Sequence, residues 1–274
     1  MTLKNITHKY ITALTILVCS MICSCSALDY HPYDAHITGA KNLTEKNVRL
    51  IEEALEGKKE FRFAMISDTQ RWFDETEMAI EAINARDDID FVVHGGDLSD
   101  FGITDEFMWM RDLLCKFRAP HITVIGNHDC IGTGKASYET IYGAANYAFN
   151  AGDTRFICLN TNALEYDYSC PIPDFNFIEN ELENWDPNIK KSIFLMHVKP
   201  FDDEFNNNVA RVFQAYITRF PGLQFCIYGH NHNLAVNEPF NDGVKYYGCP
   251  NIADRIYLLF TVNEEGYTYE VVKF

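Results

Sequence analysis

Five short apolar runs in this chain each end in residues of the kind that bind metal ions. The runs have the length and composition of buried β-strands. They are Phe61–Ile66 before Asp68 and Gln70, Phe91–His94 before Asp97 and Asp100, Ile122–Ile125 before Asn127 and His128, Ile193–Met196 before His197, and Phe225–Tyr228 before His230 and His232. Helical stretches lie between several runs, which predicts an α/β fold with helices over a mostly buried sheet. Because ligands of open α/β sheets bind beyond the carboxyl ends of the strands, we expect these five ends to converge on one site.

Other stretches extend the α/β pattern. Thr154–Leu159 predicts another buried strand, and the last twenty residues predict two strands around the turn Asn263–Gly266. Apolar residues at helical spacing predict helices at Glu45–Glu56, Glu75–Ala85, Asp105–Phe117 and Asn208–Phe220. The loop Asn162–Phe177 carries four aromatic residues. Two interpretations of this loop stay open, namely that it lines a substrate or that it is a surface loop with packed aromatics.

The strand-end motifs follow one another in a definite order. They are Asp68-x-Gln70, Gly96-Asp97-x-x-Asp100, Gly126-Asn127-His128-Asp129, His197, and Gly229-His230-x-His232. Each motif alone is weak, because short patterns occur by chance. Together they resemble the motif set of calcineurin-like metallophosphoesterases, over roughly residues 61 to 235. The resemblance implies an α/β fold built as a four-layer α/β/β/α sandwich, with two mixed β-sheets flanked by helices and a metal site at the carboxyl ends of the strands.

The resemblance also implies a site for two divalent metal ions. The first ion would be held by Asp68, Gln70, Asp97 and His232, and the second by Asp97, Asn127, His197 and His230. Asp97 would bridge the two ions. In such a site the metals polarise the phosphoryl oxygens, and a metal-bridging hydroxide attacks the phosphorus.

Two further residues match the catalytic part of the family's motifs. His128 resembles the histidine that protonates the leaving oxygen, and Asp100 resembles the carboxylate that orients this ring. Asp129 completes its motif, and we expect it to brace the loop. His94 and His121 stand outside the motifs, so we expect them to be structural.

Gln70 departs from the family's pattern, which usually has a histidine at this position. An amide oxygen is a harder donor than an imidazole nitrogen, so it favours Mn²⁺, Mg²⁺, Ca²⁺ or Fe over Zn²⁺. The identity of the metals therefore stays open among Mn, Fe, Zn and Mg.

Charge and motifs together favour a small substrate. The formal net charge is −16, which argues against nucleic-acid binding because a basic patch is its usual footprint. We therefore expect a metallophosphoesterase that hydrolyses a phosphomonoester or a small phosphodiester. Two alternatives are a degenerate scaffold of the same fold that binds a partner, and an exported adhesive or carbohydrate-binding lipoprotein. Metal analysis would separate them from the enzyme.

The N-terminal residues have the features of a targeting segment. A basic start precedes the apolar run Ile11–Ile22, which is too short to span a bilayer comfortably and has the length of a signal-peptide core. A buried N-terminal helix is the alternative. The sequence Ile22-Cys23-Ser24-Cys25 resembles the bacterial lipoprotein signal, in which the last cysteine becomes the lipidated first residue.

These features predict an exported lipoprotein, held on the periplasmic or cell-surface side of a membrane through Cys25. The predicted organisation is a signal peptide at residues 1–24, an N-terminal segment at 25–58 that packs on the domain, and one catalytic domain at 59–274. The six cysteines beyond the leader form no CxxC pair, which argues against a zinc ribbon.

Overall fold

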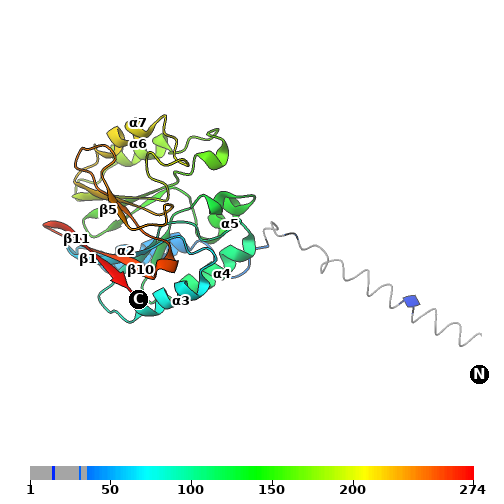
Figure 1. The fold of residues 1–274 in the computed structure, drawn as a ribbon. Coiled ribbons are helices and arrows are strands. Elements are labelled where there is room, and N and C mark those ends of the chain that lie inside the picture. Colours follow the sequence, from blue (N-terminus) through cyan, green and yellow to red (C-terminus); the bar gives the residue numbers. More distant parts are fainter. Residues whose placement is uncertain (1–13, 16–30, 32–35) are drawn as a thin grey trace, which may run out of the picture. The chain divides into compact units, whose positions relative to one another are not determined.

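Two β-sheets face each other in the computed structural model of the chain, which describes residues 14–15, 31 and 36–274 (Figure 1). The first sheet contains, in spatial order, β11 (Gly266–Lys273), β10 (Ile256–Asn263), β1 (Phe61–Ile66), β2 (Phe91–His94) and β3 (His121–Thr123). The second contains β4 (Tyr147–Ala151), β5 (Thr154–Leu159), β6 (Lys191–Met196), β7 (Leu223–Tyr228), β9 (Tyr246–Gly248) and β8 (Ala235–Asn237). Apart from residues 14–15, the predicted signal peptide lies outside the described residues, as does Cys25.

Both sheets are mixed. In the first sheet β1, β2 and β3 run parallel, whereas β10 is antiparallel to β1 and to β11. In the second sheet β5, β6, β7 and β9 run parallel, and the edge strands β4 and β8 are antiparallel to their neighbours. The parallel strands of each sheet therefore end at a common edge, as the sequence predicted.

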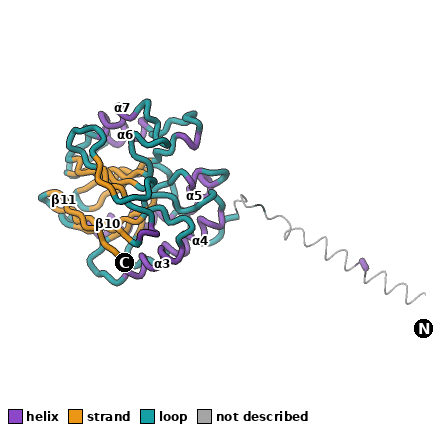
Figure 2. Tube along the Cα trace, viewed as in Figure 1, coloured by secondary structure: helices purple, strands orange, loops and turns teal. Residues whose placement is uncertain are grey.

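Helices cover the outer faces of both sheets (Figure 2). The first sheet is covered by α3 (Phe73–Asn84), α4 (Thr104–Leu114) and α5 (Gly134–Ile141), and the second by α6 (Phe175–Glu183) and α7 (Ala210–Ile217). Side chains alternate along β1, where Phe63 and Met65 enter the core between the sheets while Ala64 and Ile66 pack among the helices. This arrangement confirms the predicted four-layer α/β/β/α sandwich.

The core between the sheets is rich in stacked phenylalanines beneath the strand ends. The Phe63 ring stacks on Phe91 and Phe260 at centroid distances of 5.2 and 5.0 Å, and it meets the edge of Phe156 across the gap between the sheets. Truncating such a buried ring to alanine typically costs about 3–5 kcal/mol. These contacts hold β1, and with it the loop that begins at Asp68, in a fixed position.

Helix α2 (Leu43–Leu55) lies along the edge strands β3 and β4 of the two sheets. Its Ile51 and Leu55 belong to the core between the sheets. The Asn47 amide donates a hydrogen bond of 2.7 Å to the main-chain oxygen of His121, which ties the helix to the start of β3. The predicted boundary after residue 58 stays a prediction.

Several elements differ from those expected. The predicted loop Asn162–Phe177 ends in α6, because the Asp174 carboxylate caps the helix by accepting a hydrogen bond of 3.1 Å from the Phe177 main-chain nitrogen. Helix α5 and the short strands β4, β8 and β9 had not been predicted. No helix in the described part of the chain is long and apolar enough to cross a membrane.

Candidate metal centre

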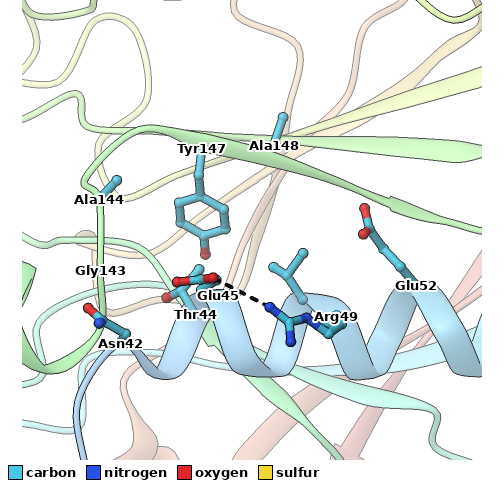
Figure 3. A pocket seen from close by; sticks show the side chains of 10 residues that line it. Asn42, Thr44, Glu45, Arg49, Glu52, Gly143, Ala144, Tyr147 and Ala148 are labelled. Carbon is cyan, nitrogen blue, oxygen red and sulfur yellow. Dashed lines mark hydrogen bonds and ion pairs between the residues drawn. The ribbon is translucent and has the colours of Figure 1, made fainter.

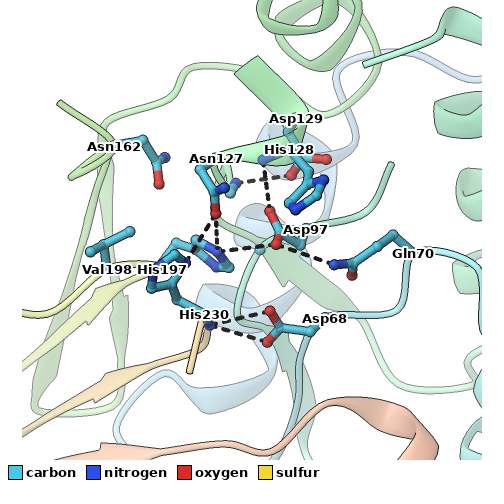
Figure 4. A network of polar contacts seen from close by, with 12 residues as sticks. Asp68, Gln70, Asp97, Asn127, His128, Asp129, Asn162, His197, Val198 and His230 are labelled. Atoms are coloured by element: carbon cyan, nitrogen blue, oxygen red, sulfur yellow. Dashed lines mark hydrogen bonds and ion pairs between the residues drawn. The ribbon is translucent and has the colours of Figure 1, made fainter. Parts of the chain in front are cut away.

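The predicted metal ligands meet at the carboxyl ends of strands from both sheets, as Figure 4 shows for all of them except His232, which contacts Asp68. Asp68, Gln70, Asp97 and Asn127 follow β1, β2 and β3 of the first sheet, and His197, His230 and His232 follow β6 and β7 of the second. Hydrogen bonds and close N···O contacts link all seven residues into one network. The structure thus brings together every residue that the sequence analysis proposed as a ligand.

Asn127, His197 and His230 lie closest together. The Asn127 Oδ1 atom is 3.1 Å from His197 Nε2 and 3.0 Å from His230 Nδ1. His197 Nε2 is also 3.4 Å from Asp97 Oδ2. Metal–ligand bonds of about 2.0–2.2 Å place neighbouring ligand atoms about 3.0–3.5 Å apart. Each of these three contacts therefore has the length expected between neighbouring ligands of one ion.

Asp68, Gln70, Asp97 and His232 form the other half of the network. Asp68 Oδ1 is 3.2 Å from His232 Nε2, and the Gln70 amide nitrogen is 3.3 Å from Asp97 Oδ2. Ligand atoms of Asp68, Asp97 and His232 all lie within 4.8 Å of one another. Gln70 Oε1 is buried and has no hydrogen-bond partner among the described residues. A buried oxygen without a partner is costly, and a cation at this position would supply one.

Asp97 connects the two halves through a single oxygen. Its Oδ2 atom contacts both Gln70 and His197, and its Oδ1 atom accepts a hydrogen bond of 3.1 Å from the His128 main-chain nitrogen. Burial acts to raise the pKa of this carboxyl, but the neighbouring His197 outweighs it and the pKa is lowered. The geometry and the charge both fit a carboxylate that is shared by two cations.

Backbone strain is concentrated in the same loops. Asp68, Asp97, His230 and His232 have φ values of 53°, 59°, 67° and 54°. Residues with a side chain rarely adopt this left-handed region, which costs of order 1–3 kcal/mol and clusters at functional sites. Because the strain falls on four of the seven predicted ligands, it supports a functional role for this cluster.

Two glycines are required by the close packing of the network. A Cβ atom at Gly126 would lie 2.0 Å from Asp97 Oδ1, and one at Gly96 would lie 2.5 Å from His197 Nδ1. Neither site tolerates a larger residue without moving a predicted ligand. The glycines before Asp97 and Asn127 therefore allow the loops to pack closely against the predicted ligands.

His128 stands beside the network with a third of its side chain exposed. Its Nδ1 atom is 2.8 Å from the main-chain oxygen of Asp100, a contact that fixes the ring and leaves Nε2 for another partner. The Asp100 carboxylate lies 3.7 Å from the same Nδ1 atom, which is too far for a hydrogen bond, and its expected role in orienting the ring stays a prediction. That carboxylate is instead paired with Arg71, through contacts of 2.6 Å from both Nε and Nη2.

The sequence analysis missed Arg71, although it directly follows Gln70. An unmatched arginine beside a motif carries no spacing signal, and only the fold shows that it meets Asp100. Asp129 behaves as expected, since its buried carboxylate accepts hydrogen bonds from the main-chain nitrogens of Leu98, Ser99 and Gly126 and so braces two loops. Those three donors hold the Asp129 carboxylate in one position.

A separate pocket lies between α2 and β4 and has a volume of about 470 Å³ (Figure 3). Its polar side chains include the ion pair between Glu45 and Arg49, and Tyr147 points into it. The pocket shares no residue with the predicted metal site, so the two are distinct.

The chain is similar to known proteins in sequence and in fold. The sequence model of the family described as calcineurin-like phosphoesterase matches residues 61–234. A 3',5'-cyclic-nucleotide phosphodiesterase from Nostoc sp. is 23% identical over 199 residues, which are 69% of this chain and 73% of that protein.

Solved structures show the same fold at low sequence identity. A purple acid phosphatase from yellow lupin (Lupinus luteus) has a TM-score of 0.60 at 17% identity, over 80% of this chain and 52% of the lupin chain. This chain therefore spans about half the length of the lupin enzyme. A dimetal phosphatase from Danio rerio has a TM-score of 0.57 at 12% identity, over 78% and 98% of the two chains. GAP50, the anchor in the inner membrane complex of Plasmodium, also has a TM-score of 0.57, at 14% identity and over 79% and 85%.

Proposed function

The chain belongs to the calcineurin-like phosphoesterase family, and we propose that it is a metal-dependent hydrolase of phosphomonoesters or small phosphodiesters. One observation carries this proposal. Seven residues with side chains of metal-ligating types follow five separate strand ends and are joined in a single network of close contacts. Such convergence has no role in a structural core, where buried polar groups of this density would be costly.

The donor set suits two divalent cations. Asp68 and Asp97 contribute two negative charges and the other five ligands are neutral, so two such ions leave a net charge of about +2 to hold a phosphate. When bound, these ions would polarise the phosphoryl oxygens and activate a water molecule. The oxygen donors Gln70 and Asn127 favour Mn²⁺ or Fe over Zn²⁺.

His128 is the proposed general acid. The Asp100 main-chain oxygen accepts a hydrogen bond from Nδ1–H, so a second proton on Nε2 is free to pass to the leaving oxygen. The hydrogen bond from its main-chain nitrogen to Asp97 fixes the position of the ring relative to the metal ligands. We expect the transfer to matter most for alcohols, which leave poorly without a proton.

The remaining parts of the proposal concern the setting of the enzyme. The net charge of −16 repels long polyanions, so a small phosphate ester is the proposed substrate rather than nucleic acid. The lipoprotein-like leader supports an exported protein that touches a membrane only through a lipid on Cys25. Labelling with a radioactive fatty acid, in the wild type and in Cys25→Ser, would test the anchor.

A non-catalytic scaffold is the second candidate. It is supported by the structural similarity to GAP50, whose description as an anchor shows that this fold is not confined to proteins named as enzymes. The presence of His128 and of all seven ligand-type residues favours catalysis. A chain that binds no metal would favour the scaffold.

Hydrolysis of two chromogenic esters tests the proposed function. The protein is loaded with Mn²⁺, Mg²⁺, Zn²⁺ or Fe²⁺ and assayed with 4-nitrophenyl phosphate, a monoester, and bis(4-nitrophenyl) phosphate, a diester. We expect turnover of at least one ester that chelation removes and added metal restores. A metal-loaded protein that hydrolyses neither ester would refute the proposal.

A further inference from the structure

Arg71 occupies a position that the family motifs do not explain. Its guanidinium holds the Asp100 carboxylate with two contacts of 2.6 Å, and Asp100 in turn holds His128 through its main-chain oxygen. Asp100 therefore connects the Arg71 guanidinium to the proposed general acid. Gln70, a predicted ligand, directly precedes Arg71 in the chain. Arg71 is thus next to a predicted ligand in the chain and shares Asp100 as a partner with His128.

The Arg71 guanidinium retains donors for a ligand. Two of its five N–H groups point to Asp100, and the other three have no partner among the residues that the structure describes. The side chain is 61% exposed, whereas the Asp100 side chain is 9% exposed. One edge of the guanidinium is thus bound to a buried carboxylate, and the other edge is accessible.

The Asp100 loop does not depend on Arg71 alone for its position. The Glu106 carboxylate accepts hydrogen bonds of 3.1 and 3.0 Å from the main-chain nitrogens of Asp100 and Phe101. The carbonyl that fixes His128 is therefore already held from α4. Arg71 also has a φ of 70°, which is a strained conformation for a residue with a side chain. A simple counterion for Asp100 would need neither the strain nor the exposed edge.

We infer that Arg71 binds a non-bridging oxygen of the substrate's phosphoryl group through its free N–H donors. This inference rests on the proposed function and adds a phosphate-binding residue to it. A guanidinium suits the task because its planar fork matches the geometry of phosphate oxygens and it stays charged at any working pH. The Asp100 pair keeps the fork in one orientation, so little entropy is lost when phosphate arrives.

Lys199 is a second positively charged residue close in sequence to a predicted ligand, and its environment differs from that of Arg71. Lys199 is two residues after His197, but its ammonium group pairs with Asp202 and lies 5.7 Å from the centre of the Tyr228 ring. Its side chain is 15% exposed. Lys199 is therefore engaged by the protein, which leaves Arg71 as the better candidate for an approaching anion.

Calorimetric titration with inorganic phosphate tests the contact without requiring turnover. The Mn²⁺-loaded wild type is compared with Arg71→Gln, Arg71→Lys and the control Arg118→Gln. Arg118 is an exposed arginine just before β3, at the opposite end of that strand from the site. We expect Arg71→Gln to weaken phosphate binding about 10- to 100-fold at unchanged metal content, as for a lost charge-assisted hydrogen bond. Arg71→Lys should fall in between, and Arg118→Gln should match the wild type.

Titrations in the Asp100→Asn protein separate phosphate binding by Arg71 from mere neutralisation of the Asp100 carboxylate. If Arg71 only neutralises Asp100, then Asp100→Asn removes the need for it, and adding Arg71→Gln should change nothing further. The inference instead predicts that Arg71→Gln weakens phosphate binding about 10- to 100-fold in the Asp100→Asn protein as well. An Asp100→Asn/Arg71→Gln protein that binds phosphate as tightly as Asp100→Asn alone would overturn the inference.

The two proposals fail in distinguishable ways. A wild type that binds Mn²⁺ and phosphate but hydrolyses neither chromogenic ester would refute the proposed hydrolase, while the Arg71 contact would stand on the titrations. A wild type that hydrolyses an ester, together with an Arg71→Gln protein of unchanged phosphate affinity, would refute the Arg71 contact alone.

Discussion

Replacing Gly126 by alanine should damage the metal site while leaving most of the fold intact. The added Cβ atom would lie 2.0 Å from Asp97 Oδ1 and 2.2 Å from the Asp97 main-chain nitrogen, whereas real contacts of this kind essentially never fall below 3.0 Å. One partner must therefore move by about 1 Å. Asp97 is the residue that connects both halves of the network, so its displacement disturbs both proposed metal positions at once.

The size of the effect follows from packing and from linkage. Overpacking of this kind typically costs about 1–3 kcal/mol of stability. A ligand that binds only the folded protein at 100 times its Kd adds about 2.7 kcal/mol of stability. If the displaced carboxylate weakens metal binding 100-fold, the same metal concentration adds only about 0.4 kcal/mol. We therefore expect most of the metal-dependent stabilisation to disappear in Gly126→Ala.

Urea denaturation with and without Mn²⁺ measures both parts of this effect. Gly57→Ala is the control, because Gly57 has a φ of 72° and no atom within 4 Å of an added Cβ. It should lose about 1 kcal/mol from backbone strain and keep the full response to metal. A Gly126→Ala protein with the stability and the Mn²⁺ response of the wild type would refute the close packing of Gly126 against Asp97.

Three other perturbations have definite outcomes. His128→Ala should keep its bound metal and lose about 10²–10⁴-fold in turnover of alkyl phosphates. The loss should be smaller with 4-nitrophenyl esters, because 4-nitrophenolate leaves without a proton. Equal losses with the two kinds of ester would argue against a general acid. Gln70→His replaces an oxygen donor by nitrogen, so a titration should show tighter Zn²⁺ binding relative to Mn²⁺, and unchanged selectivity would remove Gln70 from the ligand set. Burial lowers the pKa of His121 to about 4, so the unfolded chain takes up its proton near pH 6.5 and the folded chain does not. As the pH falls from 6.5 to 4, this residue should therefore lower the free energy of unfolding by up to about 1.4 kcal/mol per pH unit. Urea denaturation with chelator present should show a flatter pH dependence for His121→Leu. An unchanged pH dependence would contradict a neutral buried His121.

Strand positions and ligand identities could be predicted because both leave local signals. The bounds of β1, β2 and β5 coincide with the predicted apolar runs, since most residues of these strands are apolar and buried. The ligands could be placed because each follows such a run directly. What the sequence supplied was thus the order of strand ends and the residue types at each end.

The parts that escaped prediction depend on contacts between distant segments. Asp100 is one case, because its carboxylate pairs with Arg71 while its main-chain oxygen contacts His128. The path of the Arg71 loop in the fold decides which residue the carboxylate meets. Strand β4 is another, since it is an edge strand whose alternating burial is weak and whose pairing with β5 fixes its conformation. Helix α5 begins without a side-chain cap, so no start signal marks it in the sequence.

The count of metal ions bound per chain tests the central claim most directly. The protein is loaded with Mn²⁺, freed of excess metal and measured by plasma emission spectroscopy, alongside Asp97→Asn. We predict two ions per wild-type chain and loss of bound metal in Asp97→Asn, whose neutral amide cannot replace a carboxylate shared by two cations. A wild type that binds no metal, or an Asp97→Asn protein that keeps two ions, would contradict the account.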